Sequence, residues 1–332
     1  MTADSPRAEV DEPASNQSLT SNHGHIGDFL FKGISVGSGI LILVILAAVA
    51  LFLIMQAVPA FLGDPDYQQY GNTWVYVAPY LFGTIWASFL ALLIAVPVAV
   101  GIALYISHYA PKRLRVPVAF VIDLLAAVPS VVFGLWGINT LAPMLVPVYR
   151  WLNTHLGWIP LFGGTVSGTG RTMLTAALVL AIMILPIITS LSREVFLRTP
   201  RLHEEASLAL GATRWEMIQQ VVLPFGRSGI VSASMLGLGR ALGETMAVAM
   251  VLSGGRDITF RLLTSHNPNT IAANIALSFP EADSFAVPQL IATGLVLFVI
   301  TFVVNIAGRA ITGGLRPARV KRNRRPAGKE ST

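Results

Sequence analysis

Charged side chains are missing from four long intervals of this chain. No Asp, Glu, Lys or Arg lies within residues 33–63, 67–111, 172–192 or 284–308. A charged side chain at the centre of a bilayer costs about 2.5 to 3.5 kcal/mol, and about 20 apolar residues are enough to span the hydrocarbon core. Each of the four intervals therefore predicts one membrane-spanning helix.

Two further stretches are equally apolar but carry isolated charges, namely Asp123 in the first and Arg240 with Glu244 in the second. With 54% hydrophobic and 12% charged residues, the chain is too apolar for the two soluble domains that its length would otherwise suggest. We therefore expect an all-α integral membrane protein with six transmembrane helices. The predicted helices cover residues 34–60, 79–106, 116–141, 172–192, 228–253 and 286–308.

The positions of Lys and Arg predict the orientation of these helices. Basic loops near the ends of spans stay in the cytoplasm, and placing both termini there puts most of the 23 Lys and Arg residues on that side. Residues 1–33 are polar and contain Ser, Asn and Pro clusters, so we expect a disordered cytoplasmic tail. Residues 309–332 form a basic cytoplasmic tail, which sets the topology or, alternatively, contacts membrane lipid. No aromatic side chains interleave with this basic run, so nucleic acid is not an expected partner.

The loop 193–227 is the one long connection on the predicted cytoplasmic side, and its pattern predicts two short helices. Thr199 is the expected cap of the first helix, and Gly211 ends it in a left-handed conformation. The run from Thr213 to Glu216 forms a capping box for the second helix, which we expect to end at Leu223-Pro224. An amphipathic hairpin of this kind enters a groove on another protein or lies on the lipid surface, and the pattern alone favours neither.

Arg240 and Glu244 are four residues apart, so we expect them on one face of the fifth helix, near the middle of the membrane. A guanidinium there suits an anion pathway, because its planar donor fork matches phosphate oxygens. Glu244 would then balance Arg240 when no substrate is bound. A purely structural ion pair between helices explains the same two residues equally well.

Asp123 lies close to the cytoplasmic end of the third predicted helix. It is a possible gate residue, although an ion pair with a nearby Arg such as Arg115, or snorkelling toward the interface, is the favoured interpretation.

The sequence offers no enzymatic or metal-binding chemistry. It has no cysteine, its six histidines lie outside the predicted helices, and no Gly-x-x-x-x-Gly-Lys-Ser/Thr motif for ATP is present. We therefore expect no catalytic residues, no metal site and no cofactor bound by this chain, and any energy source must come from a partner.

The loop 193–227 resembles the EAA loop of the permeases of ABC importers. The residues that carry the resemblance are Glu205 and Ala206, then Gly211, and then Leu223 and Pro224 at the family's interval. In that family the loop inserts into a cleft of a cytoplasmic ATPase. The resemblance therefore implies that these five residues couple the chain to an ATPase.

Two other runs, residues 239–248 and 127–137, are similar to the phosphate-importing branch of these permeases, the PstC family. This resemblance implies a type I ABC importer permease (MetI-like) fold in the bacterial cytoplasmic membrane, with Arg240, Glu244 and Thr245 in the pathway of inorganic phosphate. A permease for another solute or oxyanion remains an alternative. So does a secondary transporter driven by an ion gradient, although interrupted helices in matching halves are not visible.

The same resemblance implies the partners and the domain organisation. The expected partners are a PstA-like second permease, a PstB-like ATPase dimer that carries ATP and Mg, and a PstS-like extracytoplasmic phosphate-binding protein. The chain itself would be a non-catalytic subunit. Its permease core would cover residues 79–308, and the first helix, residues 34–60, would be an addition packed outside that core.

Overall fold

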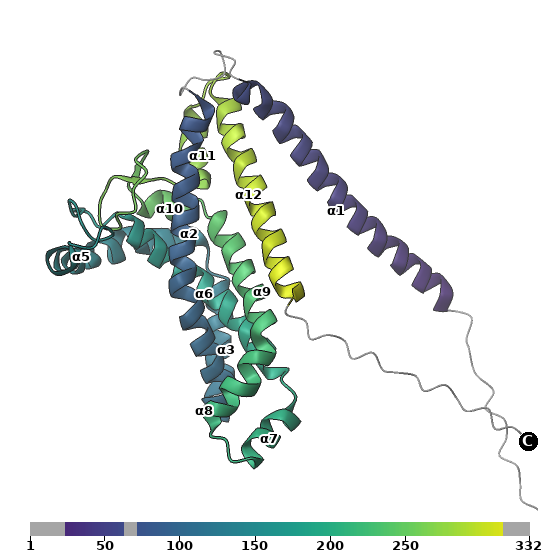
Figure 1. Cartoon of the computed structure of the whole chain (residues 1–332). Helices are drawn as coiled ribbons and strands as arrows, with labels where there is room; N and C mark the ends of the chain where they lie inside the picture. The colour runs from purple at the N-terminus through teal and green to yellow at the C-terminus, as the bar shows by residue number, and fades with distance from the viewer. Residues whose placement is uncertain (1–23, 63–71, 315–332) are drawn as a thin grey trace, which may run out of the picture. The chain divides into compact units, whose positions relative to one another are not determined.

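The computed structural model describes residues 24–62 and 72–314, and six of its helical segments are long and apolar enough to cross a membrane (Figure 1). By its internal contacts the chain divides into two units, residues 1–52 and 53–332. The first unit contains most of helix α1 (Gly24–Phe61). Helix α1 begins earlier than expected, so the part of the predicted disordered tail from residue 24 onward is helical, and the rest lies outside the described residues.

Helices α2 (Thr73–Leu104) and α6 (Met173–Leu197) form the centre of the second unit. Five alanines at every fourth position of α2 are almost completely buried, which lets the two helix backbones approach closely. Both helices begin at side-chain caps, because Asn72 accepts a hydrogen bond from the Trp74 amide and Thr172 accepts one from the Thr175 amide. These five alanines are Ala87, Ala91, Ala95, Ala99 and Ala103.

Helix α9 (Leu223–Leu242) packs against α6, and α12 (Val287–Gly314) packs against α9. Glycines on α9 allow the first contact: a Cβ atom on Gly237 would lie 2.8 Å from the Cδ1 atom of Ile188. These two interfaces place α9 between α6 and α12, and the candidate site lies where the three helices meet.

The third predicted helix is broken, not continuous. Helix α3 (Lys112–Ala126) ends before Pro129, and α4 (Ser130–Trp136) starts after it. Proline has no amide hydrogen and prefers an extended residue before it, so it stands at a helix start. From α4 the chain runs through the π-helix η3 (Gly137–Leu141) into α5 (Ala142–Leu156), which the sequence analysis did not predict as helix.

The fifth predicted helix, 228–253, is also broken. Helix α9 ends at Leu242, and the short helix α10 (Met246–Val251) follows after a three-residue break. The predicted single helix is interrupted at Gly243, and glycine has a low helix propensity.

The connection between α10 and α12 contains structure that the sequence analysis missed. It includes two parallel two-residue strands, β1 (Gly254–Gly255) and β2 (Asn267–Pro268), helix α11 (Ile271–Ser278) and the 3-10 turn η5 (Phe279–Glu281). Helix α11 is fixed to α2, because the Ile271 amide donates to Thr84 Oγ1 over 2.9 Å. In Figure 1, α11 lies near one end of α2, and the loop 193–227 lies beyond the other.

Candidate functional site

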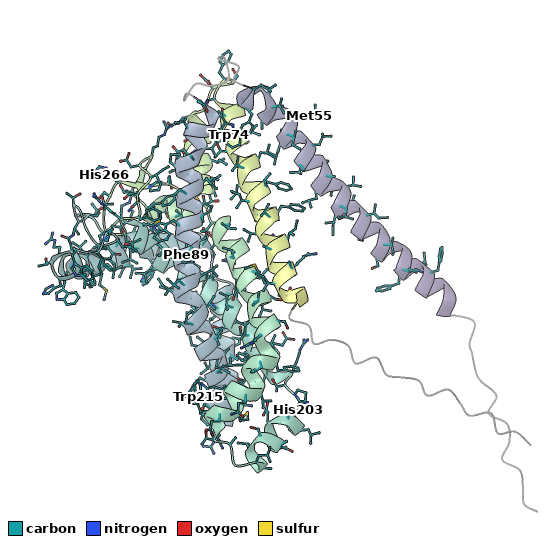
Figure 2. All side chains as sticks on the ribbon, in the orientation of Figure 1. Met55, Trp74, Phe89, His203, Trp215 and His266 are labelled. Carbon is teal, nitrogen blue, oxygen red and sulfur yellow. The ribbon has the colours of Figure 1, made fainter. Side chains whose placement is uncertain are left out.

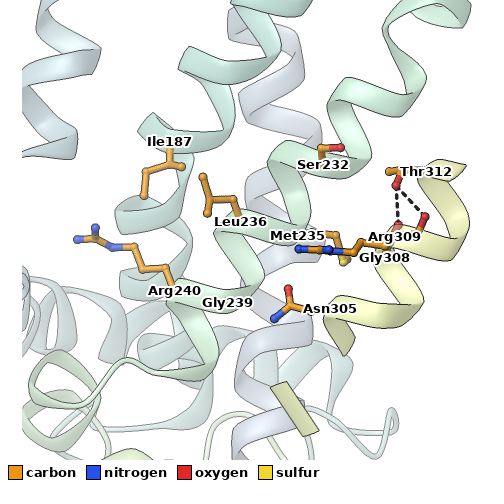
Figure 3. A pocket seen from close by; sticks show the side chains of 10 residues that line it. All are labelled: Ile187, Ser232, Met235, Leu236, Gly239, Arg240, Asn305, Gly308, Arg309 and Thr312. Atoms are coloured by element: carbon orange, nitrogen blue, oxygen red, sulfur yellow. Dashed lines mark hydrogen bonds between the residues drawn. The ribbon is translucent and has the colours of Figure 1, made fainter. Parts of the chain in front are cut away.

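A cavity of about 580 Å³ lies between α6, α9 and α12 (Figure 3). Its polar and charged lining comes from the last two of these helices, while Ile187 is the contribution of α6. A second cavity of about 390 Å³ shares Ser232, Arg309 and Thr312 with the first, so the hollow continues along α9 toward its start. We call the two cavities together the α9 groove. The first cavity is lined by Ile187, Ser232, Met235, Leu236, Gly239, Arg240, Asn305, Gly308, Arg309 and Thr312.

Arg240 is the predicted pathway residue that lines the α9 groove. It stands in the last turn of α9, where the helix dipole favours a cation. Its Nε atom is buried and has no hydrogen-bond partner, and among the described residues no carboxylate lies within ion-pairing distance of it. Figure 3 shows the side chain pointing away from α12, on the side of α9 where Ile187 lies. The guanidinium therefore has donors available for an anion.

Glu244 does not balance Arg240 as predicted. Its side chain is 8% exposed, and its Oε1 atom accepts a hydrogen bond of 3.2 Å from the Ala247 amide in the first turn of α10. The physical reason is the break after Leu242: it removes the common helix face that four-residue spacing requires, and it creates a helix start whose amides need acceptors. Glu244 therefore caps α10.

Thr245, the third predicted pathway residue, also belongs to this break. It is the residue that precedes α10, and its hydroxyl donates to the Gly243 carbonyl over 3.2 Å. The structure thus places Arg240, Glu244 and Thr245 around one helix break, with Arg240 lining the α9 groove and the other two shaping the turn.

Two residues of α12 that the sequence analysis did not connect with a site also line the groove. Arg309, assigned there to the basic tail, lies on α12 opposite α9, and Asn305 lies one turn earlier on the same helix. The sequence did contain a signal for this pair. Asn305 is a polar residue near the end of an apolar span, and the cation Arg309 follows it four positions later. No Asp or Glu is among the residues that line the two cavities. The α9 groove therefore carries two guanidinium groups and suits an anion.

The loop 193–227 has the predicted hairpin of helices, α7 (Arg201–Ala209) and α8 (Arg214–Met217). The capping box is confirmed in full: the Thr213 amide donates to Glu216 Oε2 over 2.7 Å, and the Glu216 amide donates to Thr213 Oγ1 over 3.3 Å. Gly211 has φ of +90°, as the left-handed end of the first helix requires.

Two details of the predicted hairpin are wrong. Thr199 does not cap α7: its hydroxyl is buried without a hydrogen-bond partner, and Pro200 is the residue before the helix. Leu223-Pro224 does not end the second helix either. The π-helix η4 (Ile218–Val222) joins α8 directly to α9, and its wider turn accommodates Pro224, the second residue of α9.

The hairpin presents its side chains outward. No residue of α7 is buried, so Glu205 and Ala206 are accessible, and Leu210 is 90% exposed. Trp215 is 52% exposed and lies with His203 at this end of the second unit (Figure 2). Exposed apolar side chains beside charged ones are typical of a surface that docks a partner.

One contact ties α7 to the end of α2. Glu204 Oε1 lies 3.5 Å from His108 Nε2, and His108 Nδ1 lies 2.7 Å from Ser107 Oγ. Ser107 and His108 belong to the π-helix η2 (Tyr105–Tyr109), which continues α2. The two partners are 96 residues apart in the sequence, so local patterns gave no signal for this contact.

Asp123, the possible gate or ion-pair residue, lies on α3 and lines a cavity with Arg115 and Arg193. Within residues 24–62 and 72–314 no ion pair of Asp123 within 4 Å is formed, so the structure does not contain the expected pair with Arg115. Snorkelling toward the interface and a role as a gate stay predictions. In the same residues, no group of three His, Asp or Glu side chains gathers as a metal ion would require.

Comparison with known proteins gives matches in sequence and in overall fold. Residues 96–317 match the family described as "Binding-protein-dependent transport system inner membrane component". The chain is 46% identical over 306 residues to "Phosphate transport system permease protein PstC 2" of Mycobacterium tuberculosis, covering 87% of this chain and 92% of that protein. It is 39% identical over 293 residues to "Phosphate transport system permease protein PstC" of Xylella fastidiosa, covering 85% of this chain and 89% of that protein.

Solved structures show the same fold at low sequence identity. A chain of a bacterial alginate ABC transporter, crystallised in complex with an alginate pentasaccharide-bound periplasmic protein, is similar with a TM-score of 0.56 and 18% identity over 86% of this chain and 94% of that one. A chain of the MetNI methionine ABC transporter in an inward-facing conformation is similar with a TM-score of 0.50 and 18% identity, covering 74% of this chain and 97% of that one. The predicted MetI-like importer fold is confirmed.

Proposed function

We propose that this chain, which belongs to the family of inner-membrane components of binding-protein-dependent transport systems, forms half of the pathway by which an ATP-driven importer moves inorganic phosphate. Within that family the chain belongs to the PstC permeases. It is a multi-pass membrane subunit without catalytic activity of its own. The observation that carries the phosphate assignment is the α9 groove, whose lining includes two guanidinium groups and no carboxylate.

Arg240 is the proposed phosphate ligand of the pathway. Its planar donor fork matches two oxygens of a tetrahedral anion, and its buried Nε atom has no protein acceptor to give up first. Glu244 and Thr245 act through position: they hold the break at which α9 ends, and so they fix where Arg240 stands. Asp123 lies on α3, outside the α9 groove, and its role as a gate stays a prediction.

The hairpin of α7 and α8 is the proposed contact with the ATPase, with Glu205, Ala206 and Gly211 at the docking surface. Leu223 and Pro224 lie where the hairpin joins α9, so a movement of the hairpin reaches the helix that carries Arg240. ATP-driven closure of the ATPase would in this way expose the α9 groove to each side of the membrane in turn.

ABC importer permeases work with a second permease subunit, an ATPase and a binding protein. We propose that the partners here are a PstA-like permease, a PstB-like ATPase dimer that binds ATP and Mg, and a PstS-like phosphate-binding protein. We also propose that both termini lie in the cytoplasm, on the side of the docking hairpin, as the Lys and Arg distribution predicts.

Reconstitution of the assembled importer in proteoliposomes tests this function. We expect uptake of labelled phosphate that requires ATP and the binding protein and does not follow a sodium or proton gradient. Unlabelled phosphate should compete with the labelled ion, whereas sulfate should not. Gradient-driven uptake would support a secondary transporter, and competition by sulfate would support a permease for another oxyanion.

Substitution of Arg240 tests the pathway itself. Arg240→Ala should abolish uptake while the complex still assembles, because it removes the guanidinium that lines the α9 groove beside the helix break. Arg198→Ala is the matched control, since Arg198 is exposed and paired with Glu194 outside the α9 groove. Wild-type uptake by correctly assembled Arg240→Ala would exclude Arg240 from the pathway.

A further inference from the structure

A second charged cavity, separate from the α9 groove, lies beside helices α3 and α6. It has a volume of about 360 Å³, and its charged lining consists of Arg115 and Asp123 on α3 and Arg193 on α6. A small adjoining void shares Asp123 and Arg193 and is also lined by Thr189. We call this the α3/α6 cavity.

Polar atoms in the α3/α6 cavity lack protein partners. The Nε atoms of Arg115 and Arg193 are both buried without a hydrogen bond. Thr189 is completely buried, and its hydroxyl has no partner either. Buried donors are nearly always hydrogen-bonded in native proteins, so the two unpartnered guanidinium Nε atoms that line this cavity indicate a ligand that is rich in acceptor oxygens.

The charge of the α3/α6 cavity selects an anion. Two guanidinium groups face one carboxylate, and the Asp123 side chain forms no ion pair within 4 Å among the residues described. The lining therefore keeps a net positive charge. Arginine recognises phosphate groups in particular, because its fork can donate two parallel hydrogen bonds.

The apolar wall of the cavity favours a lipid over a free ion. Val116, Phe120 and Leu197 line it and are 73%, 66% and 52% exposed, respectively. Leu197 is the last residue of α6, a short step before the docking hairpin begins at Arg201, so the cavity lies at the hairpin's end of the membrane spans. Basic pockets between helices on the cytoplasmic side are typical sites for anionic headgroups.

We propose that the α3/α6 cavity binds the phosphate headgroup of an anionic phospholipid. Arg115 and Arg193 hold the headgroup oxygens. Val116, Phe120 and Leu197 contact the acyl chains. The proposal does not depend on phosphate transport, because it concerns the outer surface of α3 and α6 and not the α9 groove.

Native mass spectrometry of the assembled importer tests the site. The complex is purified with phosphatidylglycerol or phosphatidylcholine, and the lipid retained is compared between wild type, Arg115→Gln/Arg193→Gln and the control Arg113→Gln/Arg198→Gln. The control removes the same charge from exposed side chains outside the cavity. We expect the cavity variant to retain at least about fivefold less phosphatidylglycerol than the control. Equal retention by the two variants would overturn the proposal.

A measurement on the wild type keeps the test decisive if the cavity variant does not fold. Phosphatidylglycerol should raise the thermal unfolding temperature of the wild-type complex above its value in phosphatidylcholine, and inorganic phosphate should neither reproduce the shift nor displace the lipid. The absence of a shift would refute the site. Displacement by inorganic phosphate would refute the lipid and assign the cavity to the free ion.

Discussion

Substitution of Glu244 separates the two roles that this residue can have, a cap for α10 or a counter-charge for Arg240. Glutamine keeps an acceptor oxygen at the place of Oε1 but removes the charge, and alanine removes both. The acceptor matters because the Ala247 amide that donates to Glu244 belongs to a residue with no exposed surface. Glu244→Ala would leave that amide unsatisfied inside the protein.

The magnitude follows from this geometry. A buried donor left without a partner costs about 1 to 3 kcal/mol, and loss of a helix cap typically costs about 1 kcal/mol within a range of about 0.5 to 2 kcal/mol. The two figures describe the same hydrogen bond and are not added. We therefore expect Glu244→Ala to lower the free energy of unfolding by about 1 to 3 kcal/mol, and Glu244→Gln to lower it clearly less.

Thermal unfolding of the purified full chain and phosphate uptake by the assembled importer are the two assays. A capping role predicts the same order in both, with wild type and Glu244→Gln above Glu244→Ala. Equal stability of the two variants would refute the cap. Loss of uptake in Glu244→Gln with unchanged stability would restore the counter-charge role.

Two further substitutions test the coupling between hairpin and pathway. Gly211→Val should uncouple ATP hydrolysis from uptake, because φ at this position is +90° and a non-glycine residue in the left-handed region costs about 1 to 2 kcal/mol. An unchanged ratio of phosphate imported to ATP hydrolysed would contradict our account of the hairpin. His108→Ala should lower that ratio less strongly, because it removes the contact between the end of α2 and Glu204 while leaving the exposed docking surface intact. His155→Ala, at an exposed position of α5 outside the hairpin, is its control and should behave as wild type.

The number of membrane spans could be predicted because the cost of a buried charge marks each apolar interval. Local rules also placed the hairpin well: Gly211 and the capping box from Thr213 to Glu216 act through neighbouring backbone groups, which the sequence shows directly. The same rules failed at Pro224, because a π-helix accommodates the proline and lets the helix continue. Whether a proline breaks a helix depends on the turn before it, and that turn is set by packing.

The site was predicted less well than the fold. The charge of Arg240 left a pathway and a structural ion pair equally favoured, and the family resemblance pointed to the pathway. The expected pairing with Glu244 assumed an unbroken helix, and the break after Leu242 turned that carboxylate toward α10. Arg309 was missed because its role depends on α12 lying against α9. Contacts between distant segments, such as His108 with Glu204, leave no periodic signal in a single sequence.

The π-helix that joins α8 to α9 makes one continuous rod from Arg214 to Leu242, 29 residues long. At a rise of 1.5 Å per residue the rod measures roughly 40 Å. Trp215 stands at one tip and Arg240 near the other. If the proposed ATPase partner tilts the rod by a few degrees at the Trp215 tip, the guanidinium moves sideways by about the length of a hydrogen bond. A movement of that size would let Arg240 bind and release an anion without a change of rotamer.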